Sequence, residues 1–234
     1  ASDVYKRQLL VGVGLFIRLK IAETPEFQKA IDKAERVEVP VATLFKKHKA
    51  SLFLGTIGAV ATFVLFYLMT VFSLGWGTRA LGYSREQFLI LQMVGVIFFG
   101  LTIPVAALLS DKYGMRPVMI IVTVLIGLYG FIMAPLFLSG TAGVLAFLII
   151  GFGLMGLTYG PIGAALAEPF PTSVRYTGAS LTFNLAGILG ASVAPYIATW
   201  LATHYSFAYV GYYMTAAAVI SLIGFAFISF KRGE

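Results

Sequence analysis

The chain of 234 residues has no cysteine and few charged residues. Without cysteine it can form neither a disulfide framework nor a metal site with thiolate ligands. Only 12% of its residues are charged and 59% are hydrophobic, whereas soluble domains average about 25% charged residues. This balance also excludes an intrinsically disordered chain, which requires low hydrophobicity and high charge.

Four long runs contain no Asp, Glu, Lys or Arg: residues 50–78, 87–110, 117–167 and 176–230. A helix needs about 20 apolar residues to cross a bilayer, so the first two runs can hold one span each and the last two can hold a pair each. Turn residues divide the long runs near 139–143 and 203–206. The sequence therefore predicts an all-α membrane protein with six spans, near residues 50–74, 87–109, 118–138, 143–166, 177–202 and 208–230.

The basic residues gather on one side of these spans. The segment 18–49, the loops that follow the second and fourth spans, and the C-terminus carry thirteen Lys and Arg residues, whereas the opposite loops carry only Arg79 and Arg85. Basic loops stay in the cytoplasm, so we expect residues 20–49 and the C-terminus to be cytoplasmic. The net charge of +7 is then a topology signal and does not indicate a nucleic-acid-binding surface.

The first 49 residues divide into three parts. Residues 1–8 resemble translated sequencing-adapter sequence, and we expect them to be a non-native leader. Residues 9–19 include an apolar stretch too short to span, which we interpret as the truncated end of a preceding transmembrane helix. A signal peptide is not favoured, because charged residues follow where a small-residue cleavage site should lie.

Residues 20–49 form a charged segment with a helix signal. Thr24 can cap a helix, Pro25 fits its first position, and Pro40 ends the amphipathic pattern. We predict an amphipathic linker helix on the cytoplasmic membrane surface. A solvated linker helix without membrane contact is the alternative.

Glycine recurs along the span 143–166, at Gly153, Gly156, Gly160 and Gly163. Small residues at this spacing let membrane helices approach closely. The pattern predicts either a helix that bends or slides beside a cavity, or static close packing.

Polar side chains within the spans are few, and an unpaired amide or hydroxyl in hydrocarbon costs a few kcal/mol. We therefore expect these groups to face the bundle interior or a water-filled cavity, although hydrogen bonds between helices would satisfy them equally well. The candidates for cavity lining are Thr62, Tyr67, Thr70, Gln92, Tyr159 and Asn184. The spans lack the clustered acids, bases or metal ligands that a membrane enzyme needs, so we expect no enzyme activity, metal or cofactor.

Four sequence elements resemble the Major Facilitator Superfamily of transporters. They are AETPEF at 22–27, DKYGMR at 111–116, EPFPTSVRYTG at 168–178 and ASVAPYIA at 191–198. The last two are similar to the metabolite:proton symporter family in particular. The resemblance implies that residues 9–19 end the sixth helix of a twelve-helix fold and that residues 50–232 form its C-terminal six-helix transport bundle. Ala107, Met115 and Pro117 depart from the usual loop motif, which places a glycine and two cations there.

The resemblance also implies a function. The symporter family includes carriers of shikimate, 2-oxoglutarate, citrate, and proline or betaine. We therefore expect a secondary active transporter of the bacterial inner membrane, which moves a small organic acid or zwitterionic metabolite by proton symport with alternating access. Its partners would be the lipid bilayer, the substrate, protons and a missing N-terminal six-helix half, which would hold the proton-binding carboxylates. The alternatives are a sugar-porter-like carrier and a six-helix channel or assembly subunit.

Charged residues stand at the inner ends of neighbouring spans. They are Asp111, Arg116, Glu168 and Arg175. Charges close to the hydrocarbon edge gain by pairing, and the resemblance implies that these four form a cytoplasmic gating network that latches the helix ends in the outward-facing state. The alternative is that they only anchor the topology and cap loops.

Overall fold

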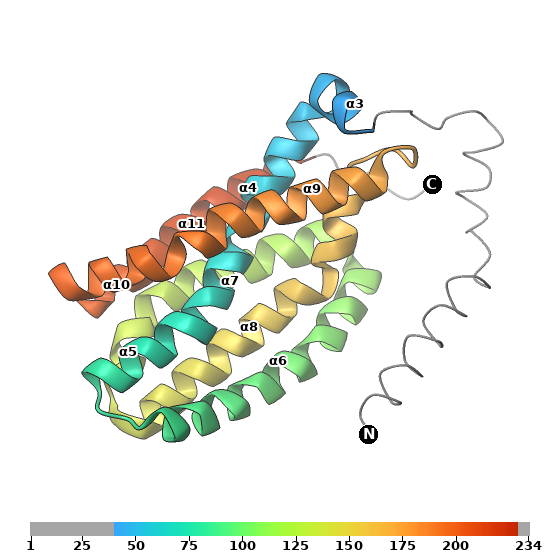
Figure 1. Cartoon of the computed structure of the whole chain (residues 1–234). Helices are drawn as coiled ribbons and strands as arrows, with labels where there is room; N and C mark the ends of the chain where they lie inside the picture. The colour runs from blue at the N-terminus through green and yellow to red at the C-terminus, as the bar shows by residue number, and fades with distance from the viewer. Residues whose placement is uncertain (1–39, 229–234) are drawn as a thin grey trace, which may run out of the picture. The chain divides into compact units, whose positions relative to one another are not determined.

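The computed structural model describes residues 40–228. Within this part of the chain, six helices are long and apolar enough to cross a membrane. Figure 1 shows them as a bundle formed by Lys49–Ala80, Arg85–Tyr113, Met115–Phe137, Gly140–Ala167, Arg175–His204 and Phe207–Phe227. All regular elements of the described residues are helical, so the predicted all-α fold with six spans is confirmed. The expected leader at 1–8, the helix end at 9–19 and the helix that follows Thr24 lie outside the described residues.

Two of the spans contain a π-helical segment. The first span consists of α4 (Lys49–Tyr67), η1 (Leu68–Phe72) and α5 (Ser73–Ala80), and the fifth consists of α9 (Arg175–Gly187), η2 (Ile188–Ser192) and α10 (Ala194–His204). The other four spans are single helices: α6 (Arg85–Tyr113), α7 (Met115–Phe137), α8 (Gly140–Ala167) and α11 (Phe207–Phe227).

Several helices extend beyond the boundaries that hydrophobicity predicts. The first span continues past residue 74 to Ala80, and α6 begins at Arg85 because Ser84 and Gln87 form a reciprocal capping box. A helix can continue beyond the edge of the hydrocarbon layer. Its polar ends are then not predicted from the hydrophobic run alone. The last helix is shorter than predicted, since it ends at Phe227 and Ile228 has an extended backbone.

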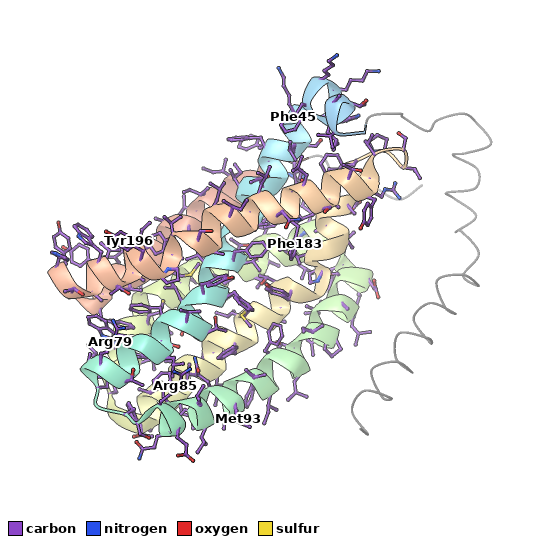
Figure 2. All side chains as sticks on the ribbon, in the orientation of Figure 1. Phe45, Arg79, Arg85, Met93, Phe183 and Tyr196 are labelled. Atoms are coloured by element: carbon purple, nitrogen blue, oxygen red, sulfur yellow. The ribbon has the colours of Figure 1, made fainter. Side chains whose placement is uncertain are left out.

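A short helix, α3 (Pro40–Lys47), precedes the first span and is not predicted from the sequence. Proline is favoured at the first position of a helix, where its missing N–H would be unpaired in any case. Leu44 is buried, whereas Phe45 is exposed (Figure 2). Pro40 thus begins a helix, in addition to ending the amphipathic pattern before it.

The first span is the most buried of the six and α6 is the least. The most extensive helix pairs are α6 with α8, α7 with α11, and α4 with α11. The large apolar side chains of α6 include Met93, which is 67% exposed and points away from the bundle (Figure 2). Since lipid tails accept such a surface and water does not, this face suits contact with the bilayer.

Side-chain hydroxyl groups of α11 form hydrogen bonds with backbone groups of neighbouring helices. Ser221 of α11 accepts a hydrogen bond from the Ala61 N–H at 2.9 Å and donates one to the Ile57 carbonyl at 2.9 Å. Thr215 of the same helix donates to the Gly127 carbonyl of α7 at 2.8 Å. These bonds fix α11 against α4 and α7 within the apolar part of the bundle, where no water competes for them.

Candidate functional site

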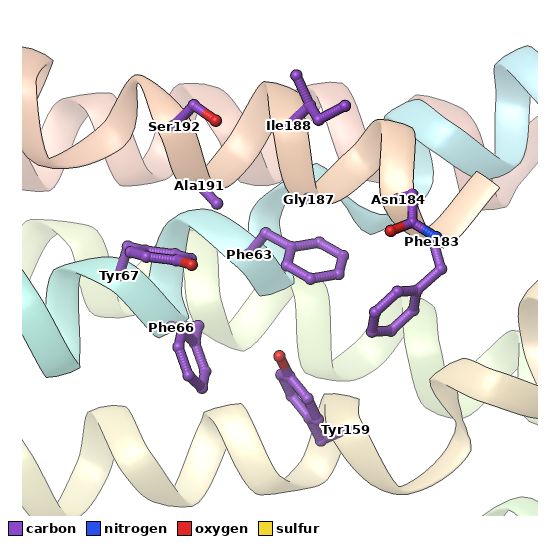
Figure 3. A pocket seen from close by; sticks show the side chains of 10 residues that line it. All are labelled: Phe63, Phe66, Tyr67, Tyr159, Phe183, Asn184, Gly187, Ile188, Ala191 and Ser192. Carbon is purple, nitrogen blue, oxygen red and sulfur yellow. The ribbon is translucent and has the colours of Figure 1, made fainter. Parts of the chain in front are cut away.

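A cavity of about 410 Å³ lies between the first, fourth and fifth spans. Figure 3 shows its lining side chains, which come from the C-terminal end of α4, from α8, and from α9 and η2. They are Phe63, Phe66, Tyr67, Tyr159, Phe183, Asn184, Gly187, Ile188, Ala191 and Ser192. Tyr67, Tyr159 and Asn184 lie about two turns or more from the nearer end of their spans, Lys49–Ala80, Gly140–Ala167 and Arg175–His204, so the cavity lies inside the bundle's apolar depth.

Aromatic rings dominate this lining. The ring centroids of Phe63 and Phe183 are 4.9 Å apart, and that of Phe66 lies 5.2 Å from Tyr67 and 5.8 Å from Tyr159. Rings at these distances hold one another by edge-to-face and tilted packing. The cluster thereby links α4 to α8 on one side and to α9 on the other.

Polar groups are placed among the rings. The hydroxyl of Tyr159 points into the space beside Phe63 and Phe66 (Figure 3). The side-chain amide of Asn184 donates a hydrogen bond to the Ser180 carbonyl at 2.8 Å, which leaves its own carbonyl oxygen as an acceptor. The cavity therefore offers oxygen atoms and aromatic faces but no formally charged side chain.

Three of the six predicted lining residues do not line this cavity. Thr62 is buried with 2% exposure, and Thr70 donates a hydrogen bond to the Phe66 carbonyl at 2.7 Å. Gln92 of α6 is buried, and its amide nitrogen donates to the carbonyls of Met69 and Thr70 at 2.7 and 3.0 Å. Thr70 and Gln92 thus form hydrogen bonds within the bundle. A list of polar residues along the sequence does not distinguish such side chains from those that line a cavity.

The hydrogen bonds of the Gln92 side chain are made to a π-helical turn. A π-helical turn shifts the backbone pairing by one residue, so it disturbs the regular hydrogen bonds of the helix around it. Met69 and Thr70 both lie in η1. Gln92 thus supplies donors to the irregular turn that directly follows Tyr67.

Most of the apolar residues that line the cavity are not among the lining residues predicted from the sequence. Phe63, Phe66 and Tyr67 recur three and four residues apart, which places them on one side of α4. The π-helical segment η2 carries Ile188, Ala191 and Ser192 into the cavity. The spacing of these aromatic residues could have predicted the lining residues of α4. We recognise no pattern in this sequence that predicts the π-helical turns.

The glycines of α8 differ in their surroundings. A Cβ atom at Gly156 would overlap Thr102 and the Phe99 carbonyl of α6, and one at Gly160 would lie 2.7 Å from the Ile103 carbonyl. At Gly153 the nearest atom would be 3.9 Å away, and at Gly163 nothing lies within 4 Å. Close packing of α8 on α6 thus depends on Gly156 and Gly160 and not on all four positions.

The four charged residues of the expected gating network lie at the ends of α6, α7, α8 and α9. Partial burial raises the pKa of the Glu168 carboxyl above its ordinary value of 4.5, and the positive charge of Arg175 opposes this shift. Glu168 and Arg175 are therefore close enough to interact. Arg175 also donates from Nε to the Phe170 carbonyl at 3.2 Å.

The other two residues of this set have different surroundings. The Arg116 guanidinium donates a hydrogen bond to the Ala226 carbonyl near the end of α11. Asp111 is exposed at the end of α6. The structure thus brings Glu168 and Arg175 together and directs Arg116 toward α11.

No group of three or more His, Cys, Asp or Glu side chains that could hold a metal ion occurs within residues 40–228. The cavity lining itself presents aromatic rings, hydroxyl groups and one side-chain amide.

Comparison with known proteins shows which family has this arrangement. A sequence profile of the Major Facilitator Superfamily matches residues 9–188 and 54–234. The chain is 48% identical over 92% of its length to the inner membrane metabolite transport protein YhjE of Escherichia coli, and covers 50% of that protein. It is 40% identical over 94% of its length to a putative metabolite transport protein of Haemophilus influenzae, and covers 52% of it.

A more distant relative has a more specific name. The chain is 30% identical over 90% of its length to the proline/betaine transporter of Salmonella typhimurium, and covers 44% of that protein. The chain thus spans about half the length of the curated relatives that it matches. With six apolar helices, a family profile that covers most of its length and relatives that are named as transporters rather than enzymes, this multi-pass membrane protein belongs to the Major Facilitator Superfamily.

Proposed function

We propose that this chain contributes one six-helix half of a secondary active transporter for a small organic acid or zwitterionic metabolite. The observation that supports this most directly is the cavity between α4, α8 and α9, whose lining includes Tyr67, Tyr159 and Asn184. Carriers of this kind bind substrate near the bilayer midplane, at the interface of two repeats that rock against each other. The names of the relatives, which include metabolite and proline/betaine transporters, agree with this class of substrate.

The second half and the coupling proton are part of the same proposal. The relatives are about twice as long as the region that this chain matches, which leaves room for a second bundle. The runs 50–78, 87–110, 117–167 and 176–228 contain no Asp, Glu, Lys or Arg. A proton symporter needs a titratable group within the membrane, so we assign that group to the second bundle.

The transport assay uses two samples in lipid vesicles: this chain alone, and this chain joined to the part of the E. coli relative that it does not cover. We expect the joined carrier to accumulate a labelled organic acid or zwitterion when an inward proton gradient is imposed, and the chain alone to accumulate none. A competition panel of organic acids, betaines and sugars then identifies the class of substrate.

Three results would contradict this proposal. They are uptake that ignores the proton gradient, competition by sugars alone, and ion currents from the chain alone, which would favour a channel. Each of these results is measured with the same preparation of lipid vesicles.

We further propose that Asp111, Arg116, Glu168 and Arg175 latch the cytoplasmic helix ends, with the basic loops on the cytoplasmic side of a bacterial inner membrane. The electrostatic interaction of Glu168 with Arg175 supports the latch. The hydrogen bond from Arg116 to α11 supports a link between loops that are far apart in the sequence.

Charge exchange tests the latch. Reversing one charge should reduce transport, and reversing its partner as well, as in Asp111→Arg with Arg175→Asp or Glu168→Arg with Arg175→Glu, should restore part of it. If no acidic and basic pair among the four recovers transport in the double variant, these residues are only topology anchors.

A further inference from the structure

We infer that the short helix α3 binds the headgroups of anionic phospholipids at the bilayer surface beside the first span. The binding surface consists of the exposed side chains of Val41, Phe45, Lys46, Lys47 and Lys49. This inference is independent of the transported solute and of the coupling ion, because it concerns only the contact between the bundle and the lipid.

The position of α3 along the chain sets its depth. The first span begins at Lys49, and the uncharged run begins at the next residue. Lys46 and Lys47 lie within one helical turn of Lys49, a rise of about 5 Å. The headgroup region of a bilayer is about 5–7 Å thick on each side, so the basic end of α3 lies at the depth of the headgroups.

The chain bends between α3 and α4. His48, which separates the two helices, has φ −125° and ψ 24°, outside the α-helical region. The helix α3 can therefore lie along the bilayer surface while α4 crosses the membrane. Contacts with α4 and α9 hold α3 at the end of the bundle (Figure 1), and its Leu44 side chain is fully buried.

Two apolar side chains of α3 lie outside the protein core. Val41 is 46% exposed and Phe45, labelled in Figure 2, is 56% exposed. They are four residues apart and thus share one face of the helix. Helices at a membrane interface bury such a face at the boundary between the headgroups and the acyl chains.

The basic side chains lie away from this apolar face. At about 100° per residue, Lys46 and Lys47 are turned by about 100° or more from it. The stem of a lysine can lie along apolar surface while its ammonium group reaches a polar partner. An apolar face combined with a basic remainder is typical of helices that bind anionic membranes.

The charge of this segment selects an anionic partner. No Asp or Glu lies between Val39 and Arg85, so the three lysines have no acidic neighbour in this stretch of the sequence. Near an anionic bilayer surface, each lysine contributes about fivefold to the affinity. A soluble acidic partner could pair with the lysines, but only a lipid also offers acyl chains to Val41 and Phe45.

The test uses the full chain in bilayer nanodiscs, with an environment-sensitive fluorophore on Ala42→Cys. Ala42 is exposed on α3, and the natural chain has no cysteine. Energy transfer is measured from this fluorophore to acyl-chain-labelled phosphatidylglycerol or to equally labelled phosphatidylcholine. We expect phosphatidylglycerol to be enriched around α3 about 5-fold or more at low salt, and less than about 2-fold in about 0.5 M salt, which screens the attraction.

Paired variants test the role of the lysines. Lys46→Gln with Lys47→Gln should reduce the enrichment to less than about 2-fold. Arg79→Gln with Arg85→Gln is the matched control, because it removes the same charge from exposed positions at the opposite ends of the spans. This control should keep the enrichment of the unchanged chain.

A second pair of variants tests the apolar face. Phe45→Ala should shift the fluorophore emission to longer wavelength, because α3 then lies less deeply in the interface. Phe131→Ala should leave the emission unchanged, since Phe131 is 57% exposed but lies in the second half of α7, toward the other membrane face.

Any of four results overturns the inference. They are equal transfer to the two lipids at low salt, enrichment that persists in the double lysine variant, equal losses in the two double variants, and equal emission shifts in Phe45→Ala and Phe131→Ala. Equal transfer to the two lipids would instead favour pairing of the lysines with the acidic residues of segment 23–38. The comparison of lipids and salt uses a chain with all its lysines, so a variant that fails to fold cannot obscure it.

Discussion

Gln92 of α6 is the side chain that supports the irregular turn of the first span. Its amide nitrogen donates to the carbonyls of Met69 and Thr70, and it lies 3.2 Å from the Ser73 hydroxyl oxygen. Tyr67 lies immediately before this turn and lines the cavity. Gln92 is therefore a positioning residue, which acts on the cavity through the backbone of α4 and η1.

Replacing Gln92 by Leu should lower the free energy of unfolding by about 1–2 kcal/mol, because buried carbonyls lose their donor. Thermal unfolding in detergent, followed by circular dichroism, measures the change. Met93→Leu is the matched control, since Met93 is the next residue and is exposed toward lipid. A midpoint for Gln92→Leu that equals the control would show that the π-helical turn does not need this donor.

Glu168 provides a pH-dependent prediction outside the membrane-spanning helices. Its pKa is raised above 4.5 because burial disfavours the charged carboxylate, and Arg175 limits the shift. The folded protein thus holds this proton to a higher pH than the unfolded chain does. The contribution of Glu168 to stability is therefore greatest below pH 4.5 and decreases as the pH rises from there through the folded-state pKa.

Arg175→Gln should raise the pKa of Glu168 further, since it removes the positive charge that favours the carboxylate. A carbon-13 NMR titration of the labelled Glu168 carboxyl measures this directly. Arg85→Gln at the opposite membrane face should leave the value unchanged. A pKa that falls or stays constant in Arg175→Gln would mean that the two side chains do not interact.

At the scale of the helix, the two π-helical segments lie next to or within the cavity lining. Both segments lie on the spans that supply most of the lining, and η2 carries three of the lining residues. A Cβ atom at Gly190 of η2 would lie 2.7 Å from that of Phe63, so η2 packs closely on α4. Irregular turns of this kind often occur at functional sites.

The glycines of α8 give a matched test of helix packing. Gly156→Ala should destabilise the bundle by about 1–3 kcal/mol, because the added methyl group overlaps Thr102 and the Phe99 carbonyl. Gly163→Ala, in the same helix, has open space and should be neutral or more stable by up to about 1 kcal/mol, since alanine favours helix. Thermal unfolding of both variants decides the matter, and equal midpoints would show that α8 does not pack on α6 through Gly156.

At the scale of the whole molecule, the loops determine how the bundle sits in the membrane. The chain has no cysteine, so a single introduced thiol reports on one position without interference. In intact spheroplasts, a membrane-impermeant maleimide should label Arg79→Cys, whereas Lys112→Cys should react only after the membrane is permeabilised. Both positions are exposed and thus equally available to the reagent. Labelling of Lys112→Cys before permeabilisation would reverse the proposed orientation.

The sequence by itself determined the class of the protein, because an uncharged run of about 20 residues can only cross a bilayer as a helix. It also determined the number of described spans and the family motifs in the loops. These features depend on local composition, which is known without the tertiary contacts between helices.

The tertiary structure decided which polar and small side chains face the cavity. Thr62, Thr70 and Gln92 are polar, as Tyr67, Tyr159 and Asn184 are, but Thr62 is buried outside the cavity and the other two form hydrogen bonds within the bundle. A Cβ atom at Gly163 would meet no neighbouring atom within 4 Å, whereas one at Gly156 would overlap Thr102. The physical reason is that the rotation of each helix and the π-helical turns, which depend on contacts between distant residues, determine where a side chain points.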